Sequence, residues 1–267
     1  GLFVGSEGTL GLITELTLRL QGQPEAISAG VCSFDTINQA VAAVIDTIQM
    51  GLPMARIEFI DAATVAAVNQ YSSAGLPELP HLLVEFHGSE AGVAEQSETF
   101  GLIVAEHDAH DFKWATQAED RSALWKMRHT AYYAVLASHP GAGAMVTDIC
   151  VPISKLADAV EQTSAEINQS SIAGPIMGHV GDGNFHAILM IDPEKPDDLK
   201  TAKDLSERMV TRALEMGGTA TGEHGIGVGK LDYMAREHGH GWTVMSSIKR
   251  ALDPQDIMNP GKLLRQN

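Results

Sequence analysis

The sequence predicts an α+β fold in which an antiparallel sheet carries helices packed on one face. Two observations support this class. Segments with the alternating pattern of strands and segments with the 3.6-residue period of helices follow one another along the 267 residues. A tight hairpin is expected in the middle of this series, and a purely parallel sheet would not need one. The order of elements therefore indicates split β-α-β units.

In the N-terminal half, strands alternate with helices. Val41, Val44 and Ile48 recur at helical spacing, and Asp35 directly before that helix is a candidate N-cap. The strands are predicted at residues 13–20, 27–34, 54–60, 81–87 and 111–115. The helices are predicted at residues 36–50, 62–69, 90–105 and 119–138.

The C-terminal half contains the hairpin. In chain order, the predicted elements are a strand at 145–152, a helix at 154–169, the hairpin at 175–191, and helices at 198–216 and 242–251. Ser154 is the expected N-cap of the first of these helices. Gly217 and Gly218 end the second helix, because glycine accommodates the left-handed backbone at a helix C-terminus.

Composition narrows the range of partners. Acidic residues outnumber basic ones by 34 to 18, and the formal charge is −16. Nucleic acid is excluded as a partner, since binding phosphates needs a surplus of Lys and Arg. No apolar run approaches the ~20 residues that span a bilayer, and nothing resembles a signal peptide. Cys32 and Cys150 lack metal-binding spacing and are predicted to be buried thiols in a reducing compartment.

The most informative motif is Gly-His-Val-Gly-Asp-Gly-Asn-Phe-His at residues 178–186. Asp-Gly at 182–183 is a strong signal for a two-residue hairpin turn. That turn would place His179 directly opposite His186 on one face, with Cβ atoms ~5 Å apart. Two imidazoles in this relation can bind one divalent metal ion. A single histidine on a strand more often has a structural role, so the hypothesis of a metal site depends on His179 and His186 lying together.

A catalytic metal needs a third protein ligand and an open position. Glu223 is the best candidate, because it lies in the glycine-rich stretch Thr-Gly-Glu-His-Gly-Ile-Gly at residues 221–227. His224 cannot easily share the ion with its neighbour, and it is better placed as a general base with a pKa near the working pH. A structural role for His224 is the alternative.

Two further polar residues are candidates for substrate contact. Arg128 falls on an apolar helical stripe with Leu124, Ala131 and Val135, where an unpaired cation is costly. It binds either an internal carboxylate or the carboxylate of a substrate, and the residues alone do not decide between them. Asn184 either serves the turn geometry or contacts a polar substrate.

Several long motifs resemble the FAD-linked oxidases of the vanillyl-alcohol oxidase / p-cresol methylhydroxylase superfamily, and within it the D-lactate dehydrogenase (cytochrome) group. The motifs lie at residues 5–11, 55–59, 83–88, 147–152, 178–186, 221–227 and 253–262. The resemblance covers essentially the whole chain. It implies a flavoenzyme whose FAD-binding domain ends at residues 1–22, with a strand at 13–20. It also implies that residues 23–267 form the ferredoxin-like cap domain, which supplies the substrate site.

The resemblance also implies roles for residues. A divalent metal, zinc or manganese, is expected on His179, His186 and Glu223, with His224 as base. Arg128 is expected to hold the substrate carboxylate, which resolves the choice left open above, and Asn184 remains a substrate-contact candidate. The residues expected to contact FAD are Gly5, Ser6, Gly8, Thr9, Gly11, Ile13 and Asn259.

The expected reaction is oxidation of a D-2-hydroxy acid, D-lactate first, with hydride transfer to flavin. Electrons would leave to a cytochrome, a quinone or an electron-transfer flavoprotein. Glycolate and D-2-hydroxyglutarate are the rival substrates, although the stretch at residues 141–146 lacks the lysine that close relatives carry there. A metallohydrolase is a rival from another class. The expected location is the cytoplasm, with peripheral association at the inner membrane left open.

The chain begins in a glycine-rich turn without a methionine, so we expect part of the FAD domain to be missing. A metal-binding but catalytically inert fragment is therefore a third hypothesis for the chain as it stands.

Overall fold

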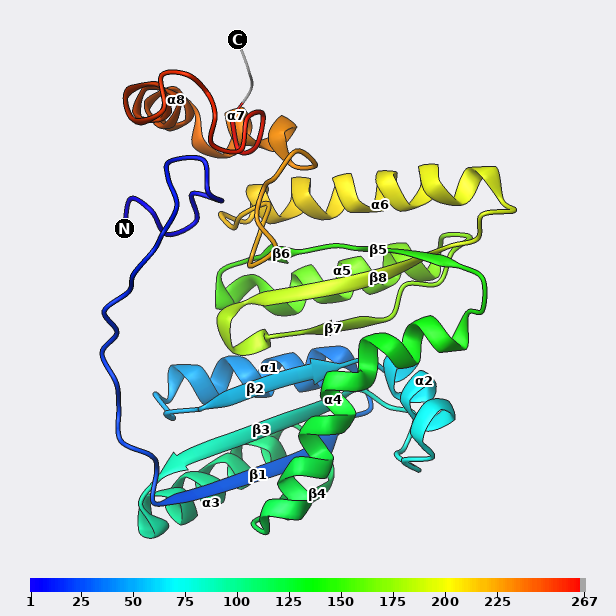
Figure 1. Ribbon diagram of the computed structural model, residues 1–267. Coiled ribbons are helices and arrows are strands. Elements are labelled where there is room, and N and C mark those ends of the chain that lie inside the picture. Colours follow the sequence, from blue (N-terminus) through cyan, green and yellow to red (C-terminus); the bar gives the residue numbers. More distant parts are fainter. Residues whose placement is uncertain (265–267) are drawn as a thin grey trace. The chain divides into compact units, whose positions relative to one another are not determined.

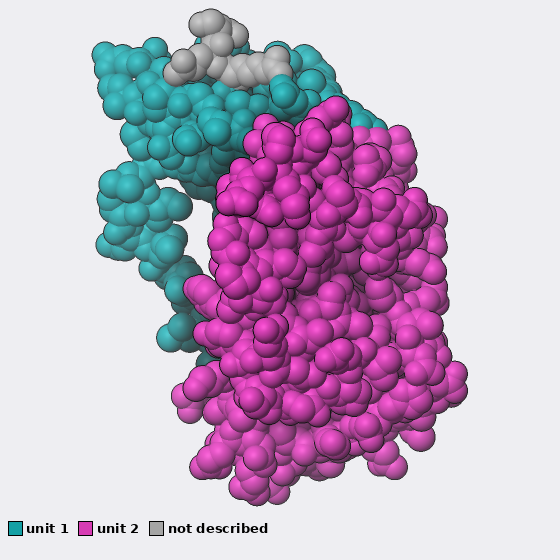
Figure 2. Space-filling model, turned by 90° about the vertical axis from the view of Figure 1, so that its right-hand side faces the viewer, with its two compact units in different colours: residues 1–22, 219–267 teal, residues 23–218 magenta. Residues whose placement is uncertain are grey.

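The computed structural model describes residues 1–264, which form two compact units (Figure 2). Unit 2 comprises Gln23–Gly218. Unit 1 combines residues 1–22 with the described residues from Thr219 onward. The units therefore meet along the chain at two places, after residue 22 and after Gly218.

The scaffold of unit 2 is an antiparallel sheet. Its strands are β1 (Ala26–Ser33), β2 (Arg56–Ile60), β3 (His81–Gly88), β4 (His110–Ala115), β5 (Gly143–Val146), β6 (Ile149–Cys150), β7 (Ile176–Gly178) and β8 (Asn184–Ile191). They lie in the order β4-β1-β3-β2-β7-β8-β5, with β6 also paired to β8 (Figure 1). All the pairings within this sheet are antiparallel, which confirms the predicted fold class.

Helices cover both faces of the sheet. They are α1 (Ile37–Gln49), α2 (Ala62–Ser72), α3 (Glu90–Glu106), α4 (Ala118–Ser138), α5 (Leu156–Asn168) and α6 (Pro196–Glu215). Alternation along β3 separates the two layers. Phe86 packs on Phe100 of α3, with ring centroids 5.8 Å apart, whereas Leu83 joins a core with Val135 of α4 and Val65 of α2. The sequence predicted helices on one face, and α2 and α4 form a second layer on the other (Figure 1).

Two helix caps differ from the prediction. Thr36, not Asp35, caps α1, because its extended backbone lets its hydroxyl accept from the N–H of Gln39 in a reciprocal capping box. Asp35 instead pairs with His110. Ser154 caps nothing, since it lies inside a 3-10 turn at Ile153–Lys155 that leads directly into α5.

The strand predicted at residues 145–152 is divided into β5 and β6. Thr147 and Asp148 lie between them, and both are buried. Thr147 still bonds to β8, because the N–H of Ala187 donates to its hydroxyl oxygen over 2.8 Å. The interruption therefore brings a buried Thr-Asp pair to the middle of β8.

The strand predicted at residues 13–20 is absent from the structure, where these residues have no regular secondary structure. Its alternating leucines Leu12, Leu16, Leu18 and Leu20 are exposed, at 68–86%. A strand needs a neighbouring strand for its backbone hydrogen bonds, and no strand among the described residues pairs with this segment.

Unit 1 contains α7 (Leu231–His238) and α8 (His240–Leu252), separated by Gly239 at φ +50°. The sequence predicted α8 but not α7, which is short and lacks a side-chain cap. Trp242 of α8 donates its indole N–H to the carbonyl of Leu263 and so ties the C-terminal segment to the helix. Within the described part of the chain, no helix has the length and apolar character to cross a membrane.

Candidate functional site

The hairpin that carries both predicted histidines has a different register from the predicted one. Met177, not His179, lies opposite His186. A 3-10 turn at Val180–Asp182 and Gly183 at φ +77° replace the two-residue turn. A Cβ on Gly183 would approach the carbonyl oxygen of Val151 to 2.1 Å, so glycine is required there.

The two histidines nevertheless lie close together within unit 2. The register differs from the predicted one by two residues, and a shift of two keeps side chains on the same face. His179 is therefore a diagonal neighbour of His186. Their ring centroids are 5.9 Å apart and the rings are nearly perpendicular.

Both rings are oriented through Nδ1. The Nδ1 atom of His179 lies 2.6 Å from Oε1 of Glu58, and that of His186 lies 3.0 Å from the carbonyl oxygen of Thr147. These oxygens accept hydrogen bonds, so Nδ1 is the donor in each ring, and in a neutral imidazole of this tautomer Nε2 is the nitrogen that can bind a metal. Histidines that bind metals are commonly oriented in this way. The two rings therefore have the donor chemistry of a metal site.

Glu58 is a site residue that the sequence analysis missed. It lies on β2, is 8% exposed, and binds two groups at once. Oε2 accepts from Nη2 and Nε of Arg128 over 2.8 and 3.1 Å, while Oε1 bonds to His179. Arg128 thus has an internal carboxylate partner, one of the two alternatives that its position on an apolar stripe left open. A charged residue inside the apolar run Ile-Glu-Phe-Ile was the available signal.

A second buried carboxylate lies on the neighbouring strand. Glu85 of β3 is 6% exposed and bonds to the indole N–H of Trp125 and to His87. Arg56 pairs with Glu85 at 3.6 Å and stacks over the ring of Trp125. Among the described residues, Glu85 contacts neither His179 nor Arg128, so it is a natural control for Glu58.

Asn184 begins β8 and is 5% exposed. Its amide Nδ2 donates to Oδ1 of Asp148 and to the carbonyl of Ile149, both at 2.8 Å. The carbonyl Oδ1 is buried and has no hydrogen-bond partner among the described residues. A buried acceptor without a partner is costly, and it suits a donor group on a ligand.

Cys150 lies next to the turn, and its Sγ is 3.2 Å from the carbonyl oxygen of Asp182. Burial, and then the charges of Asp182 and Asp148, raise the pKa of this thiol. The thiol therefore stays protonated at neutral pH, which disfavours it as a metal ligand. Both cysteines are free thiols. Cys32 is buried, as predicted, whereas Cys150 is only partly buried.

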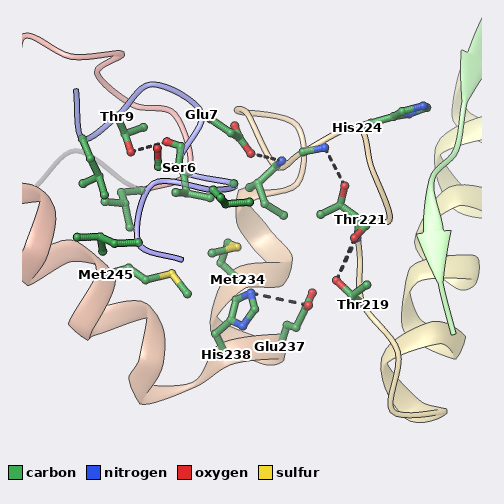
Figure 3. Close-up of a pocket in the computed structure, with 18 of the residues that line it drawn as sticks. Ser6, Glu7, Thr9, Thr219, Thr221, His224, Met234, Glu237, His238 and Met245 are labelled. Carbon is green, nitrogen blue, oxygen red and sulfur yellow. Dashed lines mark hydrogen bonds and ion pairs between the residues drawn. The ribbon is translucent and has the colours of Figure 1, made fainter. Parts of the chain in front are cut away.

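Glu223 and His224 lie in unit 1, on the loop of residues 221–227. Both side chains are about half exposed, at 49% and 45%, and Oε1 of Glu223 is 3.9 Å from Nε2 of His224. In Figure 3 the ring of His224 points away from Ser6 and Met234. The structure thus brings together the histidine pair and Arg128 in unit 2, and the Glu-His pair in unit 1.

The glycine-rich turn predicted to contact FAD is also in unit 1. Ser6 donates its hydroxyl to the carbonyl of Phe3. Thr9 donates to the carbonyl of Ser6 over 2.7 Å (Figure 3). Gly5 and Gly8 have positive φ angles, whereas Gly11 does not. The two hydroxyls therefore stabilise the shape of the turn. Ile13, at 55% exposed, lies beyond it.

Unit 1 also contains an open pocket of about 750 Å³, lined by this turn, the 219–226 segment and the helices α7 and α8 (Figure 3). Glu237 lines it and accepts from the N–H of Ala220 over 3.0 Å. Asn259, the last of the predicted FAD contacts, donates to the carbonyl of Glu7 over 2.6 Å. That bond joins the C-terminal segment to the glycine-rich turn.

Comparison with known proteins identifies relatives along nearly the whole chain. Residues 23–263 match the family model of the C-terminal domain of FAD linked oxidases. The chain is 46% identical over 264 residues to a probable mitochondrial D-lactate dehydrogenase of Danio rerio, covering 98% of this chain and 53% of that protein. It is 43% identical to a mitochondrial D-lactate dehydrogenase [cytochrome] of Arabidopsis thaliana, with 98% and 47% covered.

The glycolate oxidase subunit GlcD of Bacillus subtilis is 32% identical, over 100% of this chain and 57% of that subunit. The chain thus spans about half the length of the curated relatives it matches.

Solved structures share the fold. The 4-ethylphenol oxidase of Gulosibacter chungangensis superposes with a TM-score of 0.69 at 16% identity, covering 92% of this chain and 55% of the oxidase. A substrate-bound p-cresol methylhydroxylase gives 0.66 at 14% identity, with 91% and 53% covered. The family match over residues 23–263 establishes the family: the chain belongs to the FAD-linked oxidases and carries their C-terminal domain.

Proposed function

We propose that the chain is the substrate- and metal-binding part of a flavoenzyme that oxidises a D-2-hydroxy acid, D-lactate first, to the 2-oxo acid. The observation that carries the proposal is the pair of histidines oriented through Nδ1 beside a paired arginine, in a member of the FAD-linked oxidases. The names of the relatives at 46% and 43% identity support D-lactate. The family supports FAD as the cofactor.

His179 and His186 supply two nitrogen ligands for zinc or manganese, and Glu223 supplies a carboxylate oxygen. Two imidazoles and one carboxylate suit either ion. When bound, the ion supplies Lewis-acid chemistry that lowers the pKa of a hydroxyl group. Glu58 and the carbonyl of Thr147 keep the two rings in the orientation that this role requires.

Arg128 binds the substrate carboxylate with the edge of its guanidinium that Glu58 does not occupy. Glu58 takes Nε and one hydrogen of Nη2, while Nη1 lies 3.5 Å from the sulfur of Met177, a weak acceptor. The Nη1–Nη2 edge can still form a bidentate pair with a carboxylate. The buried Oδ1 of Asn184, which has no hydrogen-bond partner among the described residues, accepts a hydrogen bond from a polar group of the substrate.

His224 removes the hydroxyl proton, because its ring is half exposed on its loop and an imidazole nitrogen can act as a general base. When bound, FAD would supply the hydride-acceptor chemistry that oxidation at C2 needs. We propose that backbone groups of Gly5, Ser6, Gly8, Thr9 and Gly11, together with Ile13 and Asn259, contact it. A cytochrome, quinone or electron-transfer flavoprotein then takes the electrons, and the word cytochrome in one relative's name supports the first.

For the 267-residue chain taken alone, we propose metal binding without turnover. The exposed leucines of residues 12–20 lack the strand partner that a complete flavin-binding domain would supply. Titrating the chain with FAD and measuring flavin absorbance after desalting tests this. Retention of one FAD per chain would contradict it.

The decisive experiment is anaerobic stopped-flow reduction of the flavin in the intact, metal-analysed protein. D-lactate should reduce it faster than glycolate, D-2-hydroxyglutarate or L-lactate. The His224→Ala variant should bind substrate but reduce flavin about 10²–10⁴-fold more slowly, the usual range for loss of a general base. If none of these acids reduces the flavin, the proposed function is wrong; if His224→Ala reacts at the wild-type rate, only the role of His224 is wrong.

A further inference from the structure

Glu223 and His224 lie on a loop in which three successive backbone N–H groups donate hydrogen bonds to side-chain oxygens. Gly225 donates to Oγ1 of Thr221 over 2.9 Å. Ile226 donates to Oε1 of Glu7 over 2.6 Å, and Gly227 donates to Oε2 of the same carboxylate over 2.7 Å. One residue far away in the sequence therefore fixes the C-terminal end of this loop.

Glu7 adopts a backbone conformation that glutamate disfavours. Its φ is +52°, in the left-handed region where glycine, asparagine and aspartate are the usual residues. Hydrogen bonds to both the backbone and the side chain hold Glu7 in this conformation. The side chain of Asn259 donates to the backbone carbonyl of Glu7 over 2.6 Å, and the carboxylate of Glu7 accepts from the N–H groups of Ile226 and Gly227. A strained residue held in this way points to a role for its side chain.

The facing loop is shaped to receive this carboxylate. Gly225 has φ +84°, and a Cβ at this position would lie 2.8 Å from Oε1 of Glu7. Any larger residue there would displace the carboxylate or distort the backbone. The contact therefore depends on a carboxylate at one side and on glycine at the other.

A carboxylate fits these partners better than an amide of equal size. The two backbone N–H groups are donors, and an ionised carboxylate offers two acceptor oxygens and no donor. Glutamine offers one acceptor oxygen, and its NH₂ group would face the second N–H. Replacing Glu7 by Gln is therefore expected to break one bond and to set two donors against each other.

We propose that Glu7 is a positioning residue that holds the loop of residues 221–227 against the glycine-rich turn of residues 5–11. Glu223 and His224 thereby keep a fixed place relative to the turn that is proposed to contact FAD. The roles of ligand, base and flavin turn rest on the proposed function. The hydrogen bonds that hold the loop do not.

The test compares two disruptive variants with two matched controls in the intact protein. Glu7→Gln removes the second acceptor, and Gly225→Ala perturbs the same contact from the opposite side. Glu237→Gln is the first control. Glu237 holds a single backbone amide, that of Ala220, which a glutamine oxygen can still accept, and its other oxygen lies 3.7 Å from Nε2 of His238 in α7, outside the loop of residues 221–227. Gly229→Ala is the second, because no atom lies within 4 Å of a Cβ at that position.

Amide hydrogen exchange of residues 225–227 should be about tenfold faster or more in the two disruptive variants. Flavin reduction by D-lactate should be about 10- to 100-fold slower, as expected for a displaced catalytic group, with FAD content unchanged. The controls should match the wild type in all three measurements.

Unchanged exchange in both disruptive variants would overturn the inference, and so would faster exchange with an unchanged rate of reduction. A wild-type protein that no 2-hydroxy acid reduces would overturn the proposed function instead. The exchange rates would then still decide whether Glu7 holds the loop.

Discussion

The histidine pair of unit 2 and the Glu-His loop of unit 1 owe their geometry to different kinds of structure. His186 is 6% exposed on β8, a strand with neighbours on both sides, and its place follows from the sheet register and from packing on both faces. Glu223 and His224 are half exposed on a loop whose hydrogen bonds include those from Thr221 and Glu7. Many packing contacts and strand hydrogen bonds fix the histidine pair, whereas the position of the Glu-His loop depends strongly on individual hydrogen-bond acceptors.

This difference predicts where each region is vulnerable. Substitutions in unit 2 should change stability and site geometry together, because a buried side chain takes part in both. Substitutions on the loop of unit 1 should change the site while leaving the unfolding temperature nearly constant. Four predictions test this, from the largest expected effect to the smallest.

The largest effect is expected from removing a proposed metal ligand in either region. His186→Ala and Glu223→Ala should each slow flavin reduction by about 10³-fold, since a Lewis-acid metal contributes several kcal/mol. Only His186→Ala should also lower the free energy of unfolding, by about 1–3 kcal/mol, because its ring is buried. Metal content by mass spectrometry and thermal unfolding measure the two effects. Wild-type metal content in Glu223→Ala would remove Glu223 from the ligand set.

The next effect concerns pH and a buried carboxyl group of unit 2. Burial raises the pKa of Asp61, the N-cap of α2, from 3.8 to about 6, against the hydrogen bonds to Thr64 that lower it. The folded state then binds more protons than the unfolded state between these values, so this group reduces stability as pH rises from about 4 to 6.

Asp61→Asn keeps the cap and removes the ionisation. At pH 7.5 it should be more stable than the wild type by up to about 3 kcal/mol, and the difference should vanish below about pH 4. Urea unfolding across this range measures it. Hydrogen exchange of residues 221–227 in unit 1 should not change. A stability difference independent of pH would contradict the raised pKa.

A smaller effect is expected from the carboxylate that orients His179. Glu58→Gln can satisfy only one of its two partners, His179 or Arg128, so metal affinity should fall about 10- to 100-fold, as for other groups that orient metal ligands. Calorimetric titration of the metal-free protein with Mn²⁺ measures this. Glu85→Gln, an equally buried carboxylate on the same sheet face, is the control. An equal loss in both variants would mean that the change acts through packing alone.

The smallest effect is expected at the helix caps of unit 2. Thr36→Ala removes the hydroxyl of the α1 capping box and should cost about 1 kcal/mol of unfolding free energy. Ser154→Ala should cost almost nothing, because Ser154 caps no helix. Urea unfolding of both variants measures the difference. Equal costs would show that the local cap assignment is wrong.

Sequence pattern predicted most of the scaffold of unit 2. The strands β1, β3 and β4 and the helices α3 and α4 lie within about two residues of their predicted bounds, the usual uncertainty at element ends. Apolar alternation and helical spacing are local properties, so they can be recognised in the sequence without knowing which segments pack together. The strand predicted at residues 13–20 shows the limit of the method, because a strand exists only when another strand bonds to it.

The candidate site residues were named from the sequence, but their geometry was predicted only in part. The histidines lie close together, yet Met177 and not His179 lies opposite His186, because the turn contains more residues than Asp-Gly alone. The sequence drew attention to Asn184 because of its position in the turn. Only the structure shows that its Nδ2 donates to Asp148 and Ile149 while its buried Oδ1 has no hydrogen-bond partner among the described residues.

By itself, the sequence determined the fold class, the family resemblance and the residue types able to bind a metal, hold a carboxylate and move a proton. These follow from local pattern and side-chain chemistry. Only the tertiary structure decided that Glu58 joins Arg128 to His179, and that Glu7 joins two loops more than two hundred residues apart. Such pairings leave little periodic signal in the chain, because they arise when sheet register and loop closure bring distant carboxylates to their donors.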